Sequence, residues 1–164
     1  SGSGNQGMAV SIPVIEYAKE IHASEQTLYR ALVLANLVSI YQKVFIGKLS
    51  AYCGAVSAAA GAVSGIAWLD GESEEIIKKT IINTICTVGG MVCDGAKPSC
   101  ASKVAAALGT AILSLEMAKR GSAFSVGEGL VMDTAENTIK SIGRMASQGM
   151  ENTDNIILQI MLGN

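Results

Sequence analysis

The part of the sequence that decides the fold is residues 89–100, GGMVCDGAKPSC. Cys93 and Cys100 lie on either side of a polar insert, and long apolar patterns with helical spacing precede and follow it. Gly95 and Pro98 are costly inside one continuous helix, so we expect the two cysteines to face each other across a loop between two helices. Thiolates held in this way are candidate metal ligands.

A third cysteine, Cys53, lies far back in the chain within YCGA, residues 52–55, where Gly and Ala permit close approach of other backbone. Three thiolates from two places could hold a cluster with one metal position left open. Without a partner histidine they favour an iron–sulfur cluster over catalytic zinc, and C-x6-C is not a zinc-knuckle spacing. The spacing alone leaves metal binding and inert, buried cysteines equally open.

Cys86, the fourth cysteine, lies inside an apolar helical pattern and is interpreted as a core side chain. Its separation from Cys93 equals that between Cys93 and Cys100, which leaves a role as a fourth ligand open. In the loop, Asp94 and Lys97 either solvate the chain or act at the site. In the second case Lys97 would bind a substrate carboxylate.

The composition is that of a single helical domain, residues 1–164. Apolar residues make up 49% of the chain and aromatic residues 4%, and Gly occurs 18 times. Small residues let helices pack closely, and the chain is long enough to bury a core without disulfides. The net charge of −2, with no basic block, excludes the electrostatic footprint of a nucleic-acid-binding protein.

Four cysteines without a secretory signal pattern predict a reducing, cytoplasmic location. The run from Ala51 to Leu69 is uncharged and approaches the length of a membrane span. Because it consists mostly of Ala, Gly and Ser, which contribute little transfer free energy, we expect a buried helix and no membrane partner.

Periodicity and capping residues predict an all-α bundle of seven or eight helices, because no alternation long enough for strands is present. The expected helices cover residues 8–21, 25–45, about 53–69, 72–88, 98–120, 133–146 and 155–162, with 122–132 as a short helix or loop. Ser24 and Asp133 are expected N-caps, and Gly47, Gly121 and Gly149 are expected ends.

The start of the chain, GSGNQG at residues 2–7, can be interpreted as a flexible linker or a cloning scar. These residues run directly into the helix expected from Met8 to Ile21. Free amides at the positive end of a helix dipole form a good anion site. The pattern by itself leaves the disordered terminus and the anion site equally open.

The remaining residues and motifs do not point to a catalytic or cofactor-binding site. His22, the only histidine, is interpreted as a solvated residue at a helix end, and Trp68 as a core residue. The chain contains no Walker loop, and Gly2-Ser3-Gly4 lacks the preceding strand that a dinucleotide-binding turn needs. Without a second histidine or a Gly-x-Ser-x-Gly elbow, triad hydrolysis has no support.

Four segments together carry a resemblance to a known family: residues 2–7 (GSGNQG), 49–55 (LSAYCGA), 90–97 (GMVCDGAK) with Cys100, and 149–154 (GMENTD). At these residues the sequence resembles the C-terminal α domain of the L-cysteine desulfidase family, which is related to the α chain of iron–sulfur-dependent L-serine dehydratase. The resemblance covers essentially the whole chain, and the placing of the three cysteines is its most specific part.

The resemblance implies that Cys53, Cys93 and Cys100 hold a [4Fe-4S] cluster whose fourth iron is free to bind substrate. It implies β-elimination from L-cysteine or L-serine, giving pyruvate and ammonia, with sulfide from cysteine. The open iron would act as a Lewis acid. The N-terminal loop would bind the substrate carboxylate, so the expected substrate-binding residues are Ser3, Gly4, Asn5, Gln6 and Lys97.

Family members carry a further N-terminal domain, thought to include the catalytic base, and no residue of this chain is an obvious base. We therefore expect a fragment, or one subunit of a two-chain enzyme, that is inactive alone. The sequence does not choose between cysteine and serine as substrate. From the small-residue helix faces we expect a homo-oligomer. Two other interpretations remain open here: a metal-free helical interaction module and a structural zinc domain.

Overall fold

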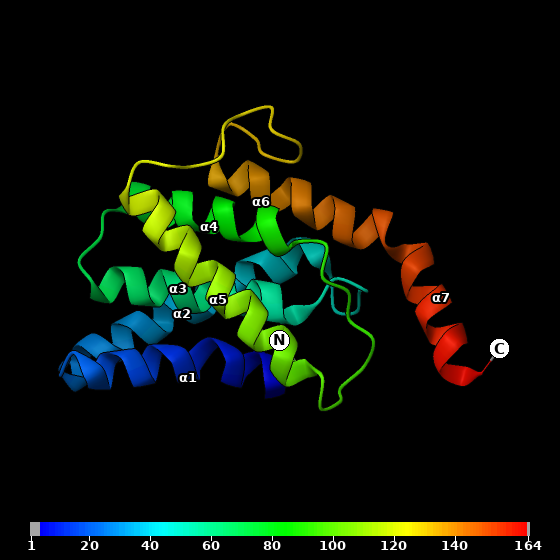
Figure 1. The fold of residues 1–164 in the computed structure, drawn as a ribbon, viewed down its shortest axis with the longest axis horizontal. Coiled ribbons are helices and arrows are strands. Elements are labelled where there is room, and N and C mark those ends of the chain that lie inside the picture. Colours follow the sequence, from blue (N-terminus) through cyan, green and yellow to red (C-terminus); the bar gives the residue numbers. More distant parts are fainter. Residues whose placement is uncertain (1–3, 164) are drawn as a thin grey trace.

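The computed structural model describes residues 4–163 and confirms the all-α prediction, with seven α-helices, one π-helix and no strand in that range. Figure 1 shows their arrangement. The elements are α1 (Gly4–Glu20), α2 (Glu25–Ile46), α3 (Gly54–Leu69), α4 (Glu74–Val88), α5 (Cys100–Lys119), α6 (Ala135–Arg144), η1 (Met145–Gly149) and α7 (Glu151–Leu162).

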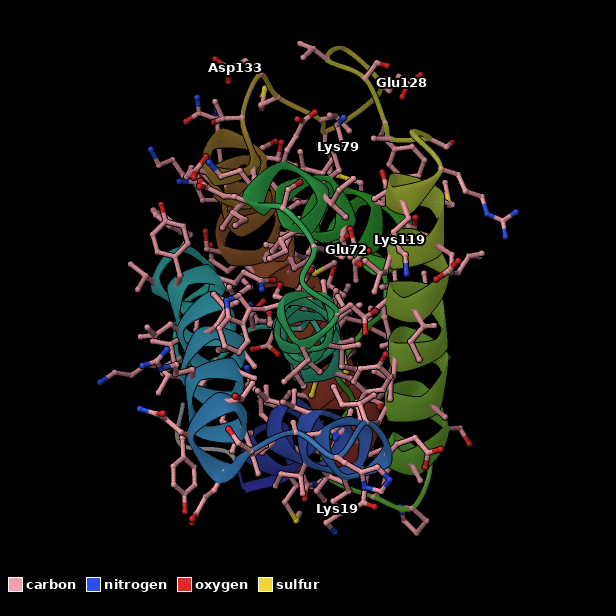
Figure 2. The ribbon with its side chains drawn as sticks, turned by 90° about the vertical axis from the view of Figure 1, so that its left-hand side faces the viewer. Lys19, Glu72, Lys79, Lys119, Glu128 and Asp133 are labelled. Atoms are coloured by element: carbon pink, nitrogen blue, oxygen red, sulfur yellow. The ribbon has the colours of Figure 1, made fainter. Side chains whose placement is uncertain are left out.

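Helix α3 is the centre of the bundle. Figure 2 looks along α3, with α1, α2, α4 and α5 around it, and α3 contacts all four of them. Its residues from Val56 to Ala67 are all buried. A Cβ atom on Gly61 would lie 2.4 Å from the carbonyl oxygen of Ala35 in α2, so glycine is what lets these two helices approach so closely. The prediction of a buried helix between Ala51 and Leu69 is confirmed.

Hydroxyl side chains cap three helices at their N-termini. Ser24 accepts the N–H of Thr27, as predicted, and Ser73 accepts that of Ile76. The predicted start of α4 at Glu72 is therefore two residues early. The prediction of Asp133 as the cap of α6 is wrong: Thr134 accepts the backbone N–H of Asn137, because the Asp133 carboxylate is taken by the Asn137 side chain instead.

The first helix begins earlier than the sequence predicts. We expected a loop up to Gly7 and a helix from Met8, but α1 is already helical from Gly4. The reason is tertiary: Gln6 is buried, and its Nε2 donates to the hydroxyl of Ser39 in α2 over 3.1 Å. This contact anchors a turn that would otherwise fray. Ser3 lies outside the described residues.

The end of the chain also differs from expectation. The helix ends at Gly149, as predicted, because η1 continues α6 to that residue, but the last helix starts at Glu151 and not at Asn155. The N–H of Met150 bonds to the carbonyl of Met145, while the hydroxyl of Ser50 takes the carbonyl of Ala146. A side chain that hydrogen-bonds to a backbone carbonyl of a helix is a known cause of a local π-helical turn.

Among the described residues, α5 is the one helix long and apolar enough to cross a membrane by length and composition. A single helix of this kind is weak support for a membrane protein. Here α5 packs against α3 and α4. Its far end joins an ionic network in which Lys119 lies 3.5 Å from Glu72 (Figure 2) and 3.8 Å from Asp70.

Candidate metal and substrate site

Two loops that are far apart in the sequence pair beside the start of α3. Tyr52 and Val92 form an isolated antiparallel bridge. The N–H of Cys53 donates to Met91 over 3.0 Å, and the N–H of Cys93 donates to Ala51 over 2.6 Å. The loop before α3 and the loop between α4 and α5 lie side by side in Figure 1. This pairing brings Cys53 and Cys93 together.

Cys100 reaches the same place from the start of α5. It is the first residue of that helix, and its Sγ lies 3.5 Å from the carbonyl oxygen of Gly95. Gly95 has a φ of +92°, which favours glycine and turns the loop back toward α5. Cys53 is likewise the residue before the first turn of α3. Thiolates at helix N-termini are stabilised by the helix dipole.

The three predicted ligands line one cavity of about 110 Å³. The described residues around it come from α1, from the starts of α3 and α5, and from the loop before α5: Asn5, Gln6, Ala9, Cys53, Gly54, Ala55, Cys93, Gly95, Ala96, Cys100, Lys103 and Val104. Cys86 lies elsewhere, in α4 and packed against the hydrophobic core. Burial raises the pKa of the Cys86 thiol to about 11, so it stays protonated at neutral pH.

The surroundings of Cys53 disfavour its thiolate form. Burial raises the pKa of Cys53 most, and the neighbouring Cys93 and Cys100 raise it further. A hydrogen bond from the backbone of Ala55 and the charge of Lys103 lower it. Metal binding at this cavity would therefore have to displace the Cys53 proton, which makes loading dependent on pH.

Lys103 is a site residue that sequence reasoning missed. Its Nζ donates to the carbonyl of Val92 over 2.8 Å and forms an ion pair with Asp94. Lys97 lies 2.5 Å from the other carboxylate oxygen of Asp94. Hydrogen bonds from these two lysines, that of Lys103 first, lower the pKa of Asp94 to about 2. The available signal was spacing, since a residue three positions after Cys100 shares its helix face.

The predicted substrate-binding residues fall into two groups. Asn5 and Gln6 line the cavity, and Gly4 precedes them in the first turn of α1. Lys97 does not line it: its ammonium group faces Asp94, and it borders a neighbouring groove that shares Asn5 and Cys100 with the cavity. The segment expected to form a loop at the cavity is thus the first turn of a helix.

The donors that line the cavity are three thiols, with no histidine among the described residues there, and soft thiolates are the ligands of iron–sulfur clusters. Within residues 4–163, no three or more His, Cys, Asp or Glu side chains are grouped closely enough to hold one metal ion. In an iron–sulfur cluster each thiolate binds its own iron, so the ligands line the wall of a cavity, as these three thiols do.

The fold and the site define an all-α domain with three thiols around one cavity at the N-terminal end of its central helix, α3. The profile of the family described as serine dehydratase alpha chain matches residues 1–159. The chain belongs to this family, as the resemblance implied.

Curated relatives cover almost all of the chain. It is 52% identical over 162 residues to a UPF0597 protein of Treponema denticola, and 53% identical over 162 residues to one of Lachnoclostridium phytofermentans. The UPF0597 protein BF3560 of Bacteroides fragilis is 45% identical over 161 residues. These alignments include 98–99% of this chain but only 38–39% of each relative. No solved structure matches the chain.

Proposed function

We propose that this chain is the cluster-bearing part of a lyase that acts by β-elimination on L-cysteine or L-serine. The products would be pyruvate and ammonia, with sulfide from cysteine. The observation that carries the proposal is the convergence of Cys53, Cys93 and Cys100 on one cavity whose wall also includes the first turn of α1. Membership of the serine dehydratase alpha chain family supports the same chemistry.

A [4Fe-4S] cluster held by the three thiolates would supply an open iron as a Lewis acid for the leaving thiol or hydroxyl and the carboxylate. The protein would bind the substrate carboxylate with the N–H groups at the start of α1 and the Asn5 amide. Gln6, which is buried, holds that turn against α2. Lys97, with a side chain 42% exposed, borders the neighbouring groove and would reach the carboxylate across the edge that Asn5 and Cys100 share with the cavity.

The remaining machinery would come from outside this chain. The chain spans less than two-fifths of the length of the relatives it matches. We propose that a further domain or a partner subunit covers the cavity and supplies the base for the α-proton. On this proposal the chain alone is inactive. We further propose that the enzyme works in the cytoplasm and that copies of it associate through apolar helix faces. One such face is that of α2, where Val33, Leu37 and Val44 are exposed.

Anaerobic reconstitution with iron and sulfide tests the cluster. We expect a visible sulfur-to-iron absorption band in the wild-type chain and in Cys86→Ser, the matched control outside the cavity. Cys53→Ser, Cys93→Ser and Cys100→Ser should each lose bound iron while the fold without metal stays intact. Zinc in the protein as purified would favour a structural zinc domain. Equal behaviour of all four variants would favour a metal-free interaction module.

The activity is tested separately on the longer protein. A full-length relative, reconstituted anaerobically, should release pyruvate from L-cysteine or L-serine, and sulfide release identifies the first. A serine at the position that corresponds to Cys93 of this chain should abolish turnover. Pyruvate from neither amino acid, by a protein that does hold the cluster, would reject the lyase assignment while leaving the metal centre in place.

A further inference from the structure

We propose that Lys103 is a positioning residue of the candidate metal centre, which holds the Cys93 segment in place and offsets the negative charge of the ligands. This inference rests on the proposed function. Lys103 itself needs no contact with substrate for this role.

The contacts of Lys103 bracket Cys93 on both sides. Its Nζ donates to the carbonyl of Val92, the residue before Cys93, and pairs with the carboxylate of Asp94, the residue after it. The amide of Cys93 itself is tied to Ala51. The backbone of Cys93 is therefore held by its hydrogen bond to Ala51, and the two residues that flank it are held by the Lys103 side chain.

The position of Lys103 on α5 links two of the ligands. Lys103 lies one turn after Cys100, so a single helix presents one ligand and holds the segment that carries another. Its side chain is 22% exposed and forms part of the cavity wall with the three thiols. A displacement of this side chain would move Cys93 relative to Cys100.

Charge gives Lys103 a second effect on the same group. Lys97 and Lys103 share the single carboxylate of Asp94, which leaves a net positive charge beside the thiolates. Lys43 of α2 is a comparison for this effect, because it is half-buried and within electrostatic reach of Cys93. Among the described groups it bonds to neither Val92 nor Asp94. Lys43 thus provides a positive charge near Cys93 without the two contacts to Val92 and Asp94 that Lys103 makes.

Three variants separate position from charge: Lys103→Met removes both, Lys103→Arg keeps the charge and a donor, and Lys43→Met removes a nearby charge alone. The first readout needs no metal. Amide hydrogen exchange at Cys93 in the chain without metal should accelerate in Lys103→Met and remain near wild type in Lys43→Met.

The second readout is iron retention against a chelator after anaerobic reconstitution. Lys103→Met should lose about 10–100-fold in retention, the range for residues that support metal ligands, and Lys103→Arg should recover most of it.

The outcomes distinguish the inference from the proposed function. If amide exchange at Cys93 in Lys103→Met is as slow as in the wild type, the positioning role is overturned. The role is also overturned if the wild-type chain takes up iron and Lys103→Met retains it equally well. A wild-type chain that takes up no iron would overturn both proposals. Equal losses in Lys43→Met and Lys103→Met would reduce the role to charge and reject the bracket. Should Lys103→Met fail to fold by circular dichroism, Lys103→Gln carries the same test, because its shorter neutral side chain cannot form the ion pair.

Discussion

At the scale of single residues, the absence of a side chain decides how closely the central helices pack. Gly61 faces the backbone of α2, where an added Cβ would lie 2.4 Å from the carbonyl of Ala35. Gly109 in α5 has nothing within 4 Å of the same position. The sequence shows both as glycines within helical patterns, and only the neighbouring helix makes one of them necessary.

We expect Gly61→Ala to lower the free energy of unfolding by about 1–3 kcal/mol, because α2 and α3 must move apart. Gly109→Ala is the matched control and should raise it by about 0.5–1 kcal/mol, since alanine restricts the unfolded chain more than glycine does. Urea denaturation monitored by circular dichroism measures both. A neutral Gly61→Ala would contradict the close approach of these helices.

At the scale of elements, each end of α3 is held by a different kind of contact. Its start meets the paired loops that carry Cys53 and Cys93. Its end leads to Asp70, which accepts the hydroxyl of Tyr17 in α1 and lies near Lys119 of α5. The Asp70 hydrogen bond is the main reason that the pKa of Tyr17 rises to about 12.

This raised pKa predicts a loss of stability in alkali. The folded state binds the Tyr17 proton more tightly than the unfolded state, whose pKa is 10.0. The contribution is therefore complete below pH 10 and is lost as the pH rises toward 12. Unfolding free energies of wild type and Tyr17→Phe, measured across this range, should converge as the pH increases. A difference that stays constant would contradict the hydrogen bond.

At the scale of the whole molecule, the last helix lies outside the packed bundle (Figure 1). No residue of α7 is buried, and Figure 1 shows it leading away from the bundle. The side chain of Met161 approaches the loop before α5, since its Cε would lie 3.1 Å from a Cβ added to Gly95. By contrast, α6 buries Ile139 and Ile142 in the core.

A chain that ends after Met150 should therefore unfold cooperatively, with a midpoint close to that of the full chain, because elements with few buried contacts contribute little to global stability. A chain that ends after Thr134 is the control and should lose cooperative unfolding, since the buried face of α6 is removed with it. Thermal denaturation measures both. A large loss on removing α7 alone would show that it packs on the bundle.

The sequence by itself determined the helical class and most helix positions, and these follow from local causes: apolar periodicity, the Ser24 cap, and glycines that end helices act over a few residues. The candidate ligands Cys53, Cys93 and Cys100 were predicted from the resemblance to a known family, because the spacing of the cysteines alone left their role open. Only the tertiary structure decided that Cys53 and Cys93 meet, because the bridge between Tyr52 and Val92 joins segments 40 residues apart. The early start of α1 at Gly4 and the continuation through η1 likewise depend on Ser39 and Ser50, which distant elements supply. The contacts of Lys103 with the Cys93 loop also join distant segments.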